Sequence, residues 1–209
     1  MAETTRDRLL AATKSLLMEI GWSATTGRAI HRRAATCHGS WMHSFPKGKE
    51  QAAAEIYTEL HEQIWANAIG AFRRAHPKYF EATIKKALDA FFESVRRLDA
   101  EAQLYFQLAR ALPDTHFGDT VRRLYLGDCE ALGTWYASTK HGLHRRSDGE
   151  VVHAIVFAPA AVLAHRGITE PIAAKLIPRL AAAAVKGMQY AETNNHPLKQ
   201  IDLRDVDLF

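Results

Sequence analysis

The chain has 209 residues, of which 47% are hydrophobic and 24% are charged, as in an ordinary globular protein. Cys37 and Cys129 are its only cysteines, too few for a disulfide framework and in keeping with a reducing cytoplasm. No apolar run approaches the roughly 20 residues that span a bilayer, and no basic segment followed by an apolar stretch precedes the first helical pattern. We therefore expect a cytoplasmic protein with no membrane span and no secretory signal.

Charge is concentrated near the N-terminus. Residues 1–50 carry eight lysines and arginines against four acids, a net charge of +4, whereas residues 51–209 carry 19 charges of each sign. A basic head on a neutral body is typical of a module that binds a polyanion, joined to a separate domain.

The first 50 residues predict three short helices. Apolar residues at helical spacing mark a first helix that begins after Thr4 or Thr5 and ends at Gly21. We expect Thr25 to cap a second helix that runs through Ala34. A third helix covers about 37–44, and Pro46 and Gly48 end it.

The remaining chain predicts about six more helices and no strand. A long amphipathic helix from about residue 50 closes at His76-Pro77, and further helices cover about 80–95, 102–112 and 121–136. The polar stretch 140–149 predicts a loop. Two alanine-rich helices follow at about 150–165, with Pro159 inside, and 170–191, and the tail 193–209 has no helical period. The sequence thus predicts an all-α fold of about nine helices.

Residues 5–55 combine spaced features that resemble the N-terminal domain of the TetR family of transcriptional repressors. These are a helix followed by Thr-Thr-x-x-x-Ile, then Gly-Ser-x-x-His-x-Phe-Pro and Lys-Glu, and the matching residues are Gly21, Thr25, Thr26, Ile30, Ala34, Gly39, Ser40, His43, Phe45, Pro46, Lys49 and Glu50. The chain departs from the family pattern in having Ala35-Thr36-Cys37-His38 where Gly-Val-Ser-Lys is usual, and Met42 where tyrosine is frequent. The resemblance implies a helix-turn-helix DNA-binding domain at 1–50 and a helical ligand-binding and dimerisation domain at 51–209.

The predicted DNA-binding residues are Thr26, Arg28, His38, Gly39, Ser40, Met42, His43, Lys47 and Lys49. A side chain at Gly39 would hold the third helix away from DNA, and His38 is best placed to read a base. Ser40 and His43 can donate to phosphates, whereas Met42 cannot donate a hydrogen bond. Lys47 and Lys49 suit phosphate contacts at the start of the long helix. Thr26 and Arg28 open the second helix, which crosses the DNA backbone in this motif.

The body residues that we predict to line a cavity for a hydrophobic or aromatic effector are Trp65, Ile69, Phe92, Tyr105, Phe106, Tyr125, Trp135, His153 and Phe157. For any single one of them a place in the core is the favoured explanation, although the resemblance implies that some cavity exists. The resemblance implies a homodimer whose four-helix interface comes from the last two helices, where Ala160, Ala161, Ala173, Ala174 and residues 181–184 allow close approach. The partners implied are double-stranded operator DNA and a small effector.

No catalytic centre, cofactor site or metal site is indicated. The eleven histidines are scattered, and no Ser/His/Asp order, Gly-rich phosphate loop or Cys-x-x-Cys is present. Cys37 is interpreted as a small residue at a helix start, with a redox switch as the alternative. We therefore predict a ligand-responsive repressor and no enzyme. Two alternatives stay open: a small helical enzyme, and a helical scaffold whose head no longer binds DNA.

Overall fold

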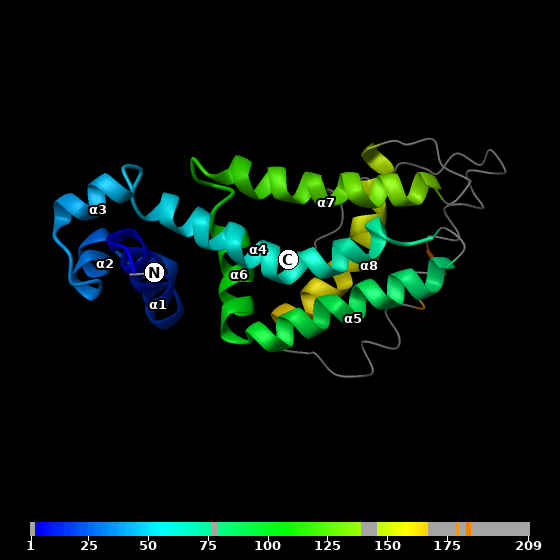
Figure 1. The fold of residues 1–209 in the computed structure, drawn as a ribbon, viewed down its shortest axis with the longest axis horizontal. Helices are drawn as coiled ribbons and strands as arrows, with labels where there is room; N and C mark the ends of the chain where they lie inside the picture. The colour runs from blue at the N-terminus through cyan, green and yellow to red at the C-terminus, as the bar shows by residue number, and fades with distance from the viewer. Residues whose placement is uncertain (1–2, 77–78, 139–145, 167–178, 180–182, 185–209) are drawn as a thin grey trace.

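A computed structural model describes residues 3–76, 79–138 and 146–166, with the isolated residues 179, 183 and 184. All of its regular structure in these ranges is helical, in agreement with the predicted fold class (Figure 1). The helices are α1 (Thr5–Ala24), α2 (Gly27–Arg33), α3 (His38–Ser44), α4 (Lys49–Arg73), α5 (Phe80–Leu98), α6 (Ala100–Ala111), α7 (Gly118–Ser138) and α8 (Arg146–His165). The described residues thus hold eight of the about nine helices predicted, and the helix expected at 170–191 and the tail 193–209 lie outside them.

Local polar contacts set the ends of the first two helices. Thr4 begins α1 with a capping box, in which its hydroxyl accepts from the Asp7 N–H and the Asp7 carboxylate accepts from the Thr4 N–H. Gly21 breaks α1 near its end with a φ of 76°, a conformation that suits glycine. The cap of α2 is Thr26 rather than the predicted Thr25, because the buried Thr25 hydroxyl donates to the Gly21 carbonyl instead.

The turn between α2 and α3 carries backbone strain. Ala35 has a φ of 52°, the left-handed region, at the position where the resemblance places a glycine. A non-glycine residue in that region costs of order 1 kcal/mol, so the rest of the head must stabilise this turn.

Most buried apolar side chains in the first 52 residues form one cluster, whereas Leu17 of α1 packs with the core of the body. The members of this cluster come from α1, α2, α3 and the first turn of α4: Leu9, Ala12, Leu16, Ile30, Ala34, Trp41, Phe45 and Ala52. Ile30 and Phe45 are fully buried and Trp41 is 3% exposed, so these three apolar side chains anchor the turn. Burial of each such side chain contributes about 1.5–3 kcal/mol, which fixes the position of the short α3.

Helix α4 runs out of this head and forms the centre of the body (Figure 1). It packs against α5, α6 and α7, and α8 packs against α7 and α5. A second, larger cluster of buried side chains fills the space between these helices, with Ile64, Phe72, Phe91 and Tyr136 among its least exposed members.

Two predicted helix boundaries are wrong. Helix α4 ends at Arg73, before the predicted His76-Pro77, because the Arg74 N–H caps it on the carbonyls of Gly70 and Phe72. Helix α8 begins at Arg146, inside the predicted loop 140–149. Gly149 explains the early start: it lies against the Cys129 carbonyl, where any Cβ would collide, so the first turn of α8 packs directly on α7.

Within the described residues, none of the helices has the length and apolarity that crossing a membrane requires.

Candidate functional site

One face of α3 is open to solvent. His38, Gly39, Met42 and His43 are all exposed and recur at the spacing of a single helix face, while Trp41 on the opposite side is buried. Ser40 is half-buried, and its hydroxyl lies 3.2 Å from the Cys37 sulfur at the helix start. Hydrogen bonds from Ser40 lower the pKa of the Cys37 thiol. The open face therefore presents two imidazoles, a thioether and bare backbone.

Two glycines of the head differ in what surrounds them. A Cβ at Gly27 would lie 2.9 Å from the Trp41 indole nitrogen, so packing within the chain requires this glycine. A Cβ at Gly39 would meet only the Cys37 sulfur, at 3.8 Å, an ordinary contact. Nothing within the described chain demands a glycine at position 39, so the requirement, if function imposes one, comes from a partner that approaches α3.

The basic residues of the head divide into paired and unpaired ones. Arg33 binds Glu19 through two hydrogen bonds of 2.7 Å, which lower the pKa of Glu19 to about 2. Arg6 pairs with Glu55 of α4, and Lys14 pairs with Glu101 of α6 at 2.9 Å. None of the ion pairs among the described residues involves Arg28, Arg32 or Lys47, and all three are exposed.

The unpaired cations flank α3. Arg28 and Arg32 lie four residues apart, on one face of α2, and Lys47 lies in the turn that follows α3. Arg32 was not among the predicted DNA-binding residues, although its i, i+4 spacing from Arg28 was a usable signal. Thr26 is exposed too, and its hydroxyl accepts from the Ala29 N–H, so it caps α2 and keeps its own proton to donate.

The two lysines near the start of α4, Lys47 before the helix and Lys49 as its first residue, have different surroundings. The Lys49 ammonium donates to the Trp22 carbonyl at 2.6 Å and lies 4.3 Å from the centre of the Trp22 ring. Partial burial lowers the pKa of Lys49. Lys47 lies over the ring of Phe117, 5.6 Å from its centre, in the segment between α6 and α7. Of the two, Lys47 is the more accessible to a phosphate.

His38 is also in contact with α2. The His31 and His38 rings meet edge to face, with centres 5.6 Å apart. The contact restrains the first side chain of the open face, and position 31 was not among the residues predicted.

In the body, most of the predicted effector residues lie in one aromatic cluster. Trp65 contacts His153 at 5.4 Å and Phe157 at 5.0 Å between ring centres, and the Tyr125 edge meets His153 at 4.8 Å. Phe92 joins through Phe91, Phe106 through Tyr105 and Trp135 through Phe72, and Ile69 is buried in the same core. Tyr125 is 37% exposed and His153 is half-buried, so these two form the outer edge of the cluster.

The Tyr105 hydroxyl is the centre of a buried polar network. Tyr57, which stacks on Tyr105, donates to that hydroxyl at 3.3 Å, and the Trp65 indole N–H donates to it at 2.8 Å. His61 Nδ1 lies 3.2 Å from the same oxygen, and His61 Nε2 lies 3.2 Å from Asp128 Oδ2. Burial raises the pKa of Tyr105 well above its usual value. The network joins α4, α6 and α7.

Tyr57, His61 and Asp128 were not predicted as site residues. Tyr57, His61 and Trp65 recur every four residues on the buried face of α4, so the histidine was a polar interruption of an apolar stripe. Asp128 lies four residues after Leu124 and four before Leu132, on the buried face of α7. Charged residues on such faces are rare unless they are paired, and that was the available signal.

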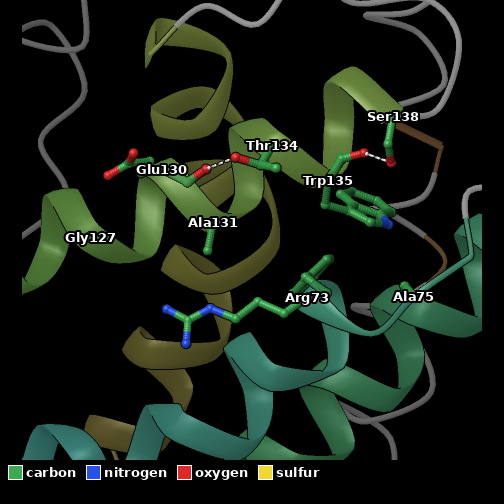
Figure 2. A pocket seen from close by; sticks show the side chains of 9 residues that line it. Arg73, Ala75, Gly127, Glu130, Ala131, Thr134, Trp135 and Ser138 are labelled. Atoms are coloured by element: carbon green, nitrogen blue, oxygen red, sulfur yellow. Dashed lines mark hydrogen bonds between the residues drawn. The ribbon is translucent and has the colours of Figure 1, made fainter.

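A separate hollow of about 510 Å³ lies between the end of α4 and α7. Figure 2 shows Arg73 reaching across it below Ala131, while the Glu130 carboxylate points away from Arg73. The Thr134 hydroxyl donates to the Glu130 carbonyl, and the Ser138 hydroxyl donates to the Trp135 carbonyl. Trp135 is the only predicted effector residue that lines this hollow, which touches the aromatic cluster only at Phe72 and Trp135.

In the part of the chain that the structure describes, no group of three or more His, Cys, Asp or Glu side chains has the arrangement of a metal site.

Known proteins match this chain in three-dimensional structure but not in sequence. No family model and no curated protein sequence matches this chain. Solved structures of TetR-family regulators do match it along nearly their whole length. A TetR-family transcription regulator from Marinobacter aquaeolei VT8 has a TM-score of 0.61 at 16% identity, covering 86% of this chain and 94% of its own.

Two further matches come from other bacteria. The fatty acid degradation regulator FadR from Bacillus halodurans has a TM-score of 0.61 at 14% identity, covering 92% of this chain and 96% of its own. PfmR, a TetR-family regulator from Thermus thermophilus, has a TM-score of 0.58 at 17% identity, covering 91% of this chain and 96% of its own. This chain therefore has the all-α fold of TetR-family transcriptional regulators.

Proposed function

We propose that this protein is a ligand-responsive transcriptional regulator that binds a palindromic operator as a homodimer and represses transcription until an effector releases it. The observation that carries the proposal is the exposed face of α3, flanked by the unpaired cations Arg28, Arg32 and Lys47 on an anchored three-helix head. The fold supports the proposal because it is the fold of regulators.

In this proposal α3 enters the major groove. His38 and His43 lie on its open face and can donate to base edges or phosphates, while Gly39 lets the helix backbone approach the DNA. Ser40, half-buried at the helix start, contributes a weak hydrogen-bond donor. Met42 contributes an apolar contact. Arg28, Arg32 and Lys47 bind phosphates on either side of α3, and the Thr26 hydroxyl donates to a phosphate. The Lys49 ammonium is divided between a phosphate and the Trp22 carbonyl.

We assign the head to residues 1–50 and the effector-binding and dimerisation body to residues 51–209. The two clusters of buried side chains favour this division, although Ala52 of α4 packs with the head. The dimer would be formed by α8 together with the segment 170–191. Ala160 is fully buried in the body of its own chain, so the α8 contribution must come from other faces of the helix.

Contacts between head and body give the effector a means of acting on DNA binding. The Lys14–Glu101 pair joins α1 to α6, and Lys47 lies over Phe117, which follows α6. Tyr105 of α6 belongs to the buried network around the predicted effector site. A ligand that moves α6 would therefore change the position of the head, provided that it binds the two states with different affinity.

Selection of bound duplexes from a random DNA pool tests the proposal. The expected result is an inverted repeat whose half-sites lie roughly 34–36 Å apart, or a multiple of that, as two symmetric heads require. Recovery of sequences no more related than the starting pool, at low salt and with the purified full chain, would contradict it.

A further inference from the structure

The body buries a carboxylate oxygen that receives no hydrogen bond from the described part of the chain. Asp128 is 8% exposed, and its Oδ2 atom has no hydrogen-bond partner among the residues that the structure describes. His61 Nε2 lies at an ion-pair distance of 3.2 Å but outside hydrogen-bond geometry. No lysine or arginine forms an ion pair with Asp128 in the described part of the chain. A buried carboxylate is costly unless it is paired and hydrogen-bonded.

The hydrogen bonds around Tyr105 engage His61 through Nδ1, the ring nitrogen that does not face Asp128. The Tyr105 hydroxyl accepts from Trp65 and Tyr57, so its own proton is left for His61 Nδ1. Asp128 Oδ2 takes part in none of these hydrogen bonds, and it faces the interior without a donor from the described residues.

Among the described residues, aromatic rings line the approach to this charge. Tyr125 is exposed at the surface, its ring and that of His153 meet edge to face, and His153 in turn packs on Trp65, whose N–H reaches Tyr105. His153 is itself neutral near pH 7, since burial lowers its pKa to about 4. Ring faces beside a buried carboxylate are the environment that attracts an organic cation.

We propose that the effector is an organic cation, a protonated amine or quaternary ammonium, whose charge pairs with Asp128 and whose apolar part packs on Trp65 and its neighbouring rings. The inference rests on the proposed function only in naming this ligand an effector, and the binding of the cation itself does not depend on DNA. The ligand enters past Tyr125 and His153, the two least buried members of the cluster. A carboxylate ligand is disfavoured by repulsion from Asp128.

Two probes of the same shape test the charge requirement. The cation 4-hydroxybenzyltrimethylammonium and its neutral carbon isostere, 4-neopentylphenol, are compared by equilibrium dialysis against the full chain. We expect the cation to bind at least about tenfold more tightly, the effect of a desolvated cation–π contact strengthened by a charge pair. Equal affinities, a preference for the neutral probe, or no binding of the cation at about 1 mM, the weak end of specific affinity, would overturn the inference.

Two isosteric variants of α7 locate the charge. Asp128→Asn should reduce the preference for the cation to less than about threefold, whereas Glu130→Gln should keep it. Glu130 is the matched control because it is two residues away on the same helix and exposed. If both variants keep the preference, or both lose it, Asp128 is not the anchor and the inference fails. The comparison of the two probes on the unmodified protein stands even if Asp128→Asn does not fold.

Operator binding, measured on the same preparations, separates this inference from the proposed function. Charge-selective binding that depends on Asp128 in a protein without operator affinity would uphold the ligand class and refute the regulator. Operator affinity in a protein that binds the two probes equally would uphold the regulator and refute the ligand class.

Discussion

The head and the body of this molecule use polar side chains in opposite ways. In the head, three cations and two imidazoles face outward around α3, while its buried side chains are apolar apart from Thr13 and Thr25, whose hydroxyls donate to backbone carbonyls. In the body, a tyrosine, a histidine and an aspartate face inward and join α4, α6 and α7. An outward-facing polar set suits a large polyanion that stays outside, and an inward-facing one suits a small molecule that is enclosed.

The two arrangements also differ in what holds them. Phe45 and Trp41 position the open face of α3 through burial, so its side chains are free to contact a partner. In the body the polar groups themselves are the contacts between helices, and a ligand that binds there must rearrange the helices. Substitutions should therefore change binding in the head with little effect on stability, and change both in the body.

The largest effect should come from filling the bare backbone of α3. Gly39→Trp is expected to remove specific operator binding, a loss of roughly 1,000-fold or more, because the indole holds α3 out of the groove. Gly39→Ala should weaken binding less. Fluorescence anisotropy with operator DNA measures both, and circular dichroism should show an unchanged helix content, since a Cβ at this position meets only the Cys37 sulfur at 3.8 Å. Wild-type affinity of Gly39→Trp would refute the placement of α3.

The next effect lies in the body and depends on pH. Burial lowers the pKa of His153 from its ordinary 6.5 to about 4, so the unfolded chain takes up the proton first as the pH falls. The stability present above about pH 6.5 should therefore be lost between about pH 6.5 and 4, by at most roughly 3 kcal/mol. Urea unfolding at about pH 7.5 and about pH 4.5, on either side of most of this interval, measures the loss, and His153→Gln should lose less stability than the unmodified protein. An equal loss in both proteins would contradict the burial of this imidazole.

The smallest effect concerns the strained turn before α3. Ala35→Gly should stabilise the protein by up to about 1 kcal/mol, because glycine adopts the left-handed conformation without the steric cost that alanine bears. Ala29→Gly, within α2, should instead destabilise by about 1 kcal/mol. Thermal unfolding of the pair distinguishes the two signs. If Ala35→Gly also destabilises, the turn is not strained as its backbone angle indicates.

The sequence predicted the head well because its signals are local. Pro46 and Gly48 mark helix ends through their own backbone preferences, whereas Gly21 only breaks α1, which was predicted to end there and continues to Ala24. Ile30, Trp41 and Phe45 recur on the buried side of a short motif. The cap at Thr26 was missed by one residue since two adjacent threonines can both serve, and only the tertiary contact of Thr25 with Gly21 decides between them.

The body was predicted less completely because its site depends on contacts between distant residues. His61, Tyr105 and Asp128 lie on three helices, and no spacing along the chain shows that their polar atoms meet. The start of α8 was missed for a similar reason, since Gly149 is held in a helix by packing on Cys129 and not by its own preference.

The most direct test of the account is the salt dependence of operator binding by the unpaired cations of α2. Anisotropy titrations over a salt series should give a steep negative slope for the unmodified protein, and Arg28→Gln or Arg32→Gln should each reduce its magnitude by about one unit per head. Arg33→Gln is the matched control, because Arg33 is bound to Glu19 and should leave the slope unchanged. A flat slope in the unmodified protein, or a slope that only Arg33→Gln alters, would contradict the assignment of this face to DNA.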